Sequence, residues 1–223
     1  MKQSNYHLFD MTRGSAGSLT KKGGNYIGKL RATNSDRSEY VLLSASAERE
    51  EIAGISFDRF GLLSQLSDGS RPRAMKMLVP SLDADNVPKP HRVKGRGDGA
   101  DDAFDSTYSN KGSSKSKGKE TDNPSLVDLL HLYITSMHFK PSEACHVYCT
   151  KVPVLENGNY RLNFHGRVCR PSVKNFQMVE FDGDLTDIVC QFGKVDEDLF
   201  HLDYKAPLNA AQAFALALCQ FNL

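Results

Sequence analysis

The last stretch of the chain, residues 207–221, reads PLNAAQAFALALCQF and is apolar on nearly every side of the helix that it would form. A helix without a polar face has to be surrounded by the rest of the protein. At about 1.5 Å per residue it reaches only about 20 Å, whereas the hydrocarbon core of a bilayer is roughly 30 Å thick. We therefore expect the buried axis of a soluble fold, beginning at Pro207, where the missing N–H of proline costs nothing. Phe214 and Leu218 are expected in the core, where a polar replacement would unfold the domain.

The chain before this segment shows short apolar or alternating runs separated by polar turns, which is typical of β-strands. Expected strands cover residues 26–31, 40–43, 75–79, 146–150, 160–164, 176–180, 187–192 and 199–204. The sequences ENGN at 156–159 and DGD at 182–184 predict hairpins. Residues 125–137 have apolar residues at helical spacing and predict a short helix. We expect one mainly β domain over residues 1–223, since barrels and sandwiches of this size are commonly single domains.

Residues 83–123 change abruptly to glycine, serine, lysine and aspartate, with Phe104 and Tyr108 as the main large apolar side chains. Such a segment cannot bury enough surface to offset its ordering entropy. A long loop is tolerated because its closure entropy grows only logarithmically with length. The sequence therefore predicts a disordered low-complexity insert at 83–123, within the domain.

Charge and cysteine content indicate which partners and which cellular compartment to expect. The 28 basic and 27 acidic residues nearly balance, so a basic partner site must be local and nucleic acid is not the expected partner. The five cysteines are odd in number and lie in apolar runs, and no signal peptide is recognisable, which predicts an intracellular compartment. The only metal-like spacing, Cys145-His146-x-x-Cys149, has no second ligand pair, so no metal is expected.

Enzyme motifs are missing from the sequence. It contains no nucleophile elbow, phosphate-binding P-loop, His-Glu-x-x-His or dinucleotide fingerprint. His165 and Cys169 could form a hydrolase pair, but a local structural role is favoured, because a nucleophile also needs a positioned base and an oxyanion hole. The chain is therefore predicted not to be an enzyme and to carry no cofactor.

Two cations of the expected strand 26–31 share one face. The strand period of two places Lys29 and Arg31 on one side and Leu30 on the other, toward the core. Their spacing of about 7 Å suits a ligand with neighbouring phosphates. A solvated basic face is the alternative interpretation of the same pattern.

Several motifs resemble the C-terminal domain of the tubby family. LNFHGRV at 162–168, SVKNFQ at 172–177, QFGKV at 191–195 and PL followed by QAFALAL at 207–218 are similar to its signature. NY at 5–6, YIGKLR at 26–31, REEI at 49–52 and PRAM at 72–75 follow the family's order. The resemblance covers nearly the whole chain outside the insert.

The resemblance implies a closed twelve-stranded antiparallel β-barrel around a buried hydrophobic C-terminal α-helix. It also implies phosphatidylinositol 4,5-bisphosphate as ligand, with Asn5, Lys29, Arg31 and Arg49 at the family's headgroup positions. Lys29 would lie between adjacent phosphates, the two arginines would donate to phosphate oxygens, and Asn5 would be a neutral hydrogen-bond partner. Arg49 is flanked by acidic residues that could pair with it: Glu48, Glu50 and Glu51.

The expected function is that of a phosphoinositide-binding adaptor or trafficking and signalling protein, cytoplasmic and peripheral at the inner plasma membrane, with the nucleus or cilium as further locations. No protein partner is indicated. The first alternative is a nucleic-acid-binding transcription regulator that uses the same basic face. The second is an enzyme or lipid scramblase, for which the sequence offers neither a nucleophile nor a transmembrane segment.

Overall fold

The computed structural model describes residues 5–13, 19–46, 50–58, 73–93, 123–136 and 145–221. Within them, twelve strands and two helices follow one another along the chain. They are β1 (Asn5–Phe9), β2 (Tyr26–Ala32), β3 (Glu39–Ser44), β4 (Glu50–Phe57), β5 (Met75–Pro80), β6 (His91–Arg92), α2 (Leu126–Thr135), β7 (Cys145–Thr150), β8 (Val154–Glu156), β9 (Asn159–Arg161), β10 (Phe176–Glu180), β11 (Ile188–Lys194), β12 (Phe200–Tyr204) and α3 (Ala210–Cys219).

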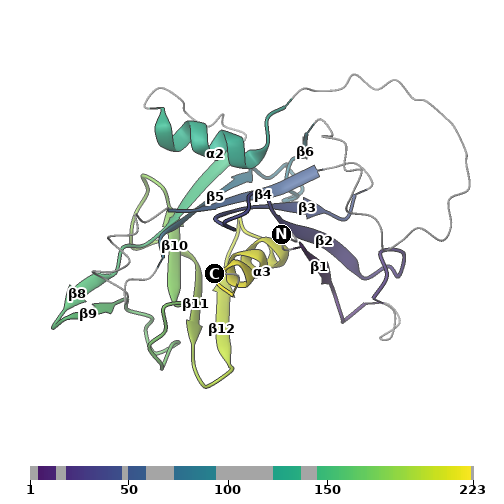
Figure 1. Cartoon of the computed structure of the whole chain (residues 1–223). Helices are drawn as coiled ribbons and strands as arrows, with labels where there is room; N and C mark the ends of the chain where they lie inside the picture. The colour runs from purple at the N-terminus through teal and green to yellow at the C-terminus, as the bar shows by residue number, and fades with distance from the viewer. Residues whose placement is uncertain are drawn as a thin grey trace, which may run out of the picture.

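The main sheet has ten antiparallel strands in the order β1-β2-β3-β4-β5-β7-β10-β11-β12, with β6 paired to β4. It curves around α3, while β8 and β9 form a separate hairpin beside it (Figure 1). The expected closed twelve-stranded barrel is not what the described residues form. In them β1 and β12 are the two ends of an open sheet, and two of the strands belong to the hairpin.

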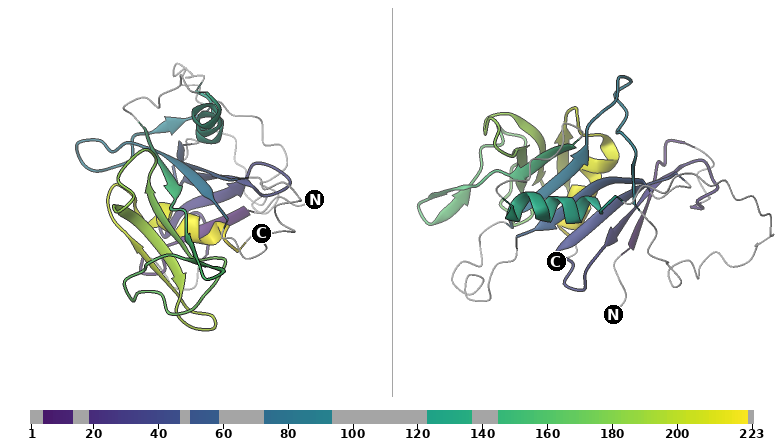
Figure 2. Two further views of the ribbon diagram at one scale, coloured as in Figure 1. Left: turned by 90° about the vertical axis from the view of Figure 1, so that its left-hand side faces the viewer. Right: turned by 90° about the horizontal axis from the view of Figure 1, so that it is seen from above.

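The core lies between the concave face of the sheet and α3. It includes the fully buried side chains of Leu30, Leu42, Ile55, Met77 and Leu216. Figures 1 and 2 show α3 on this face and α2 on the opposite, outer face. The prediction of a helix packed inside a β-structure is therefore confirmed, although the sheet around it is open.

Phe214 and Leu218, the two residues expected in the core, differ in burial. Leu218 is partly buried, but Phe214 is 48% exposed, whereas Leu216 between them is completely buried. The expectation for Phe214 is wrong, because the described part of the sheet leaves one side of α3 uncovered. The helix also begins later than expected: Asn209 is the N-cap and Pro207 lies outside the helix.

The start of α3 is fixed by a reciprocal pair of hydrogen bonds. The Gln212 N–H donates to Asn209 Oδ1 and the Asn209 N–H donates to Gln212 Oε1, both at 2.9 Å. The same Gln212 side chain donates from Nε2 to the carbonyl of Ile52 in β4, at 2.8 Å. One side chain thus caps the helix and ties it to the middle of the sheet.

Helix α2 packs closely on the outer face of the sheet. Leu126 and Leu130 form a second apolar cluster with Leu78 and Val147. At Gly54 in β4 a Cβ atom would lie 2.7 Å from the backbone of Leu126, so only glycine leaves room for the helix. The predicted helix at 125–137 is confirmed.

Most expected strands are found, and three were not expected. β9 ends at Arg161 rather than at 164, β1, β4 and β6 were missed, and β8 was given no range although the hairpin predicted at 156–159 implies a strand before it. The ENGN turn joins β8 to β9 with Asn157 and Gly158 at φ 50° and 77°, the left-handed values that a two-residue hairpin turn needs.

Of the expected insert, residues 94–122 lie outside the described residues. Its first part, 83–93, forms a turn in which the Asp83 carboxylate accepts hydrogen bonds from the N–H groups of Asp85 and Val87, followed by β6.

Candidate anion-binding site

The outer face of β1 and β2 brings three of the four predicted site residues together. Asn5 pairs directly with Arg31, and His7 pairs with Lys29, in the antiparallel ladder. Side chains of paired residues project on the same face of a sheet. Leu30, between the two cations, is completely buried in the core. The predicted orientation of Lys29 and Arg31 away from the core is confirmed.

The side chains at this face are neither fully exposed nor buried. Asn5, Lys29 and Arg31 are each half-buried. The Oδ1 atom of Asn5 is shielded from solvent and accepts no hydrogen bond from the described residues. A buried acceptor without a donor is uncommon in native structures. Because the atom is shielded, a ligand can reach it only after the Asn5 side chain turns toward solvent.

The fourth predicted residue, Arg49, lies outside the described residues, but two of its acidic neighbours can be placed. The Glu50 carboxylate forms an ion pair with Arg92 at 3.3 Å and accepts a hydrogen bond from the Ser44 hydroxyl at 3.3 Å. Glu51 is only 4% exposed and accepts hydrogen bonds from the Leu126 N–H at 2.7 Å and from the Ser125 hydroxyl. Both carboxylates thus have partners other than Arg49.

A β-bulge explains why Glu51 points to the outer face. Val41 pairs with Gly54, and Leu43 pairs with Glu51, so Ile52 is an extra residue on β4. Without it, the period of two would place Glu51 on the core side together with Ala53. The bulge aims the carboxylate at the N-terminus of α2, where free N–H groups and the helix dipole favour a negative charge.

Burial is the largest influence on Glu51 and raises its pKa above the ordinary value. The hydrogen bonds from Leu126 and Ser125 and the charges of His91 and Arg31 oppose this rise without cancelling it. Glu51 therefore interacts with the start of α2 through hydrogen bonds and, more weakly, with the charge of Arg31 on β2.

The raised pKa of Glu51 predicts a pH-dependent stability. Because its folded pKa lies above the unfolded value of about 4.3, its stabilising contribution is complete below that value and is lost as the pH rises through the folded pKa. Glu51→Gln removes the titration. We expect the free energy of unfolding of the native protein to decrease relative to that of the variant over this interval. Urea unfolding along a pH series measures both, and parallel curves would contradict the assignment.

The signature motif of residues 162–168 has a structural role. The Arg167 guanidinium donates two hydrogen bonds to the Asp203 carboxylate, at 2.7 and 2.9 Å, and lowers the pKa of Asp203 to about 2. The buried Gln177 side chain donates to the carbonyl of Asn163 at 2.9 Å. His165 lies in a turn at φ 49°, and its N–H donates to Asn163 Oδ1. These contacts fix the loop to β10 and β12 and give no catalytic arrangement.

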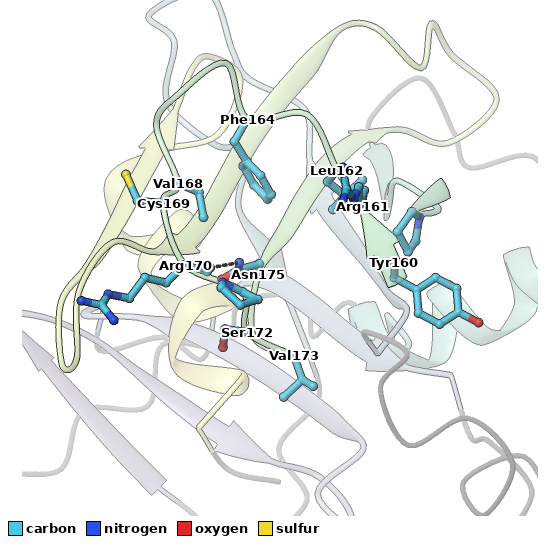
Figure 3. Close-up of a pocket in the computed structure, with 12 residues that line it drawn as sticks. Tyr160, Arg161, Leu162, Phe164, Val168, Cys169, Arg170, Ser172, Val173 and Asn175 are labelled. Atoms are coloured by element: carbon cyan, nitrogen blue, oxygen red, sulfur yellow. Dashed lines mark hydrogen bonds between the residues drawn. The ribbon is translucent and has the colours of Figure 1, made fainter. Parts of the chain in front are cut away.

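A hollow of about 850 Å³ opens beside this loop (Figure 3). Arg161 and Arg170 lie at its two ends, with Phe164 and Val168 between them. Sequence reasoning missed it, although all of its lining residues except Pro153 lie in the segment 160–175, which contains the motifs at 162–168 and 172–177. The sequence does not show that these residues enclose a hollow, because that depends on how the turns of the segment fold.

Two kinds of feature are absent from the described ranges. No group of three or more histidine, cysteine, aspartate or glutamate side chains there could hold a metal ion. None of the helices described is both long and apolar enough to cross a bilayer.

Comparison with known proteins gives a consistent family assignment. The model of the Tub family matches residues 1–223. Human Tubby-related protein 1 is 33% identical over 218 residues, which cover 92% of this chain and 33% of that protein. Protein king tubby 2 of Aedes aegypti is 32% identical over 212 residues, covering 92% of this chain and 42% of that protein. The chain thus spans a third to two fifths of the length of these relatives.

Proposed function

The chain belongs to the Tub family, and from this premise we propose that it is a non-enzymatic module that binds phosphatidylinositol 4,5-bisphosphate at the cytoplasmic face of the plasma membrane. The observation that carries the proposal is the shared outer face of β1 and β2, with Asn5, Lys29 and Arg31 at neighbouring positions. Attachment would be reversible, because it depends on one headgroup and not on a spanning segment.

Each of these side chains suits one part of the headgroup. Lys29 is a compact charge that can lie between two adjacent phosphates, while the forked guanidinium of Arg31 can donate two hydrogen bonds to one phosphate. The Asn5 side chain, once turned toward solvent, can accept a hydrogen bond from an inositol hydroxyl through its amide oxygen and donate to a phosphate oxygen through its amide nitrogen. Arg49 is proposed as a second forked donor, on the strength of the family resemblance.

Additional attraction to the membrane would come from other exposed cations. Lys21 and Lys22 are exposed in the turn that precedes β2. Near an anionic leaflet each contributes on the order of 1 kcal/mol, without regard to headgroup structure. A protein of this kind acts as an adaptor by carrying a bound partner to the membrane and by leaving when the lipid is consumed.

Vesicle sedimentation tests the proposal. Purified protein is mixed with phosphatidylcholine vesicles that contain or lack phosphatidylinositol 4,5-bisphosphate. We expect Lys29→Ala with Arg31→Ala to weaken binding about 100-fold, because two charge-assisted contacts of at least about 1.5 kcal/mol each are lost.

The matched control is Lys89→Ala with Lys205→Ala, which removes two exposed lysines elsewhere on the fold. It should bind like the native protein. Binding that survives the loss of Lys29 and Arg31, or that does not require the bisphosphate lipid, would refute the proposal.

A further inference from the structure

The β8–β9 hairpin and strands β10 to β12 lie at the end of the sheet away from β1 and β2 (Figure 1), and two hollows are found beside this hairpin. The larger is the hollow of about 850 Å³ between the 162–175 loop and the β8–β9 hairpin (Figure 3). A smaller pocket beside Arg73 and Lys151 shares Pro153, Leu162 and Asn175 with it. The two hollows therefore adjoin at these residues, and together they are called the groove below; Asn5, Lys29 and Arg31 do not line it.

The charge of this groove is one-sided. Among the described residues, its lining contains four cationic side chains, those of Arg73, Lys151, Arg161 and Arg170, and no aspartate or glutamate. Over the whole chain the two signs nearly balance, 28 against 27. A concave surface lined by one sign of charge concentrates the opposite charge. The groove is thus complementary to an anionic partner.

The existing ion pairs of the lining arginines do not oppose such a partner. Arg161 lies 3.9 Å from Glu156, and Arg170 lies 2.9 Å from Asp196, with all four side chains more than half exposed. Exposed ion pairs of this kind are worth between 0 and about 1 kcal/mol. Both arginines can exchange these carboxylates for those of a partner at little cost.

Apolar side chains accompany the cations. Val152 and Val173 line the groove and are 70% and 52% exposed. Clusters of exposed aliphatic side chains on one surface mark interaction sites. The partner is therefore expected to bring apolar groups as well as negative charge.

The walls of the groove are held in place before any partner arrives. The Asn175 side chain donates to the carbonyl of Arg170 at 2.9 Å and accepts from the N–H of Lys194 in β11 at 2.8 Å. Val168 packs on Gly193 of β11 so closely that a Cβ atom there would lie 2.2 Å from it. A surface that does not need to be ordered on binding loses less affinity to entropy.

We propose that this groove binds an extended segment of a partner protein in which acidic and aliphatic residues alternate. An extended chain directs successive side chains to opposite sides, so carboxylates can reach the arginines while aliphatic groups contact the valines. A bilayer surface is the less suitable partner, because a flat surface meets protruding side chains and cannot enter a hollow. This inference concerns a second site and does not depend on the proposed lipid binding.

Selection from a phage-displayed library of random ten-residue peptides tests this inference. On native protein we expect enrichment of peptides that alternate aspartate or glutamate with valine, leucine or isoleucine. A synthetic peptide of the enriched sequence should bind at least tenfold more weakly to Arg73→Glu with Lys151→Glu, measured by fluorescence anisotropy. Neither of these two cations forms an ion pair with a carboxylate among the described residues, so the exchange should leave the fold intact.

Arg37→Glu with Lys89→Glu is the matched control, because it makes the same change in net charge at two exposed positions outside the groove. It should bind the peptide like the native protein, and urea unfolding should show all three proteins folded. The inference is overturned if no acidic and aliphatic consensus emerges. It is also overturned if the peptide binds both double variants equally, or if only phosphatidylserine vesicles, and no peptide, respond to Arg73→Glu with Lys151→Glu.

Discussion

Leu216→Asp is expected to prevent the domain from folding. Leu216 is completely enclosed between α3 and the concave face of the sheet, so the new carboxylate would be buried without a partner. Together with the lost apolar contacts this should cost more than about 4 kcal/mol, a large part of the 5–15 kcal/mol by which domains are typically stable. Far-ultraviolet circular dichroism and size-exclusion chromatography of the purified variant measure the outcome.

Phe214→Asp is the matched control, because it places the same charge on the same helix. Phe214 is 48% exposed, so its carboxylate can stay hydrated and only part of the apolar contact is lost. We expect a folded protein that is destabilised by about 1 kcal/mol. Equal loss of folding in both variants would show that a further part of the chain covers α3 at Phe214.

Gly54→Val is expected to displace α2 from the sheet. A Cβ at position 54 would lie 2.7 Å from the backbone of both Leu126 and Val127, and backbone atoms cannot rotate aside as a side chain can. Overpacking of this kind costs about 1–3 kcal/mol. The displacement would also withdraw the Leu126 N–H from Glu51, which leaves a buried carboxylate with fewer donors. We therefore expect the free energy of unfolding to decrease by an amount at the upper end of that range.

The midpoint of urea unfolding measures this effect. Ala45→Val adds methyl groups at an exposed position after β3 and is the control. Its free energy of unfolding is expected to change by less than about 0.5 kcal/mol. An unchanged midpoint for Gly54→Val would mean that α2 does not pack on β4 as closely as the structure places it.

Much of the fold could be predicted because its elements carry local signals. The alternation around Leu30 predicted which side of β2 is buried, and the Asn-Gly pair predicted the hairpin between β8 and β9. β4 was missed because its sequence, EEIAGISF, contains a bulge at Ile52 and a glycine required by α2. Both features depend on neighbours that are distant in the sequence, so no local pattern reveals them.

In the candidate site, too, local signals predicted some features, while others depend on contacts between distant parts of the sequence. Lys29 and Arg31 could be placed on one face from the strand period alone, whereas the position of Asn5 opposite Arg31 depends on the register of β1 against β2. The partial exposure of Phe214 could not be foreseen, because sequence shows that a helix is apolar but not how completely strands enclose it. The basic groove was missed because Arg73 is distant in the sequence from Lys151, Arg161 and Arg170, and only the fold brings it to the same surface.

The hydrogen bond from Gln212 to the carbonyl of Ile52 has a consequence for biosynthesis. The bulge residue on β4 is synthesised early, but the side chain that satisfies its carbonyl belongs to a helix translated after every strand of the sheet. Domains with such distant contacts fold slowly and expose apolar surface in the meantime. While the ribosome is still producing the last strands, the concave face of the sheet has nothing to pack against, and the nascent chain is expected to need chaperone protection until α3 emerges.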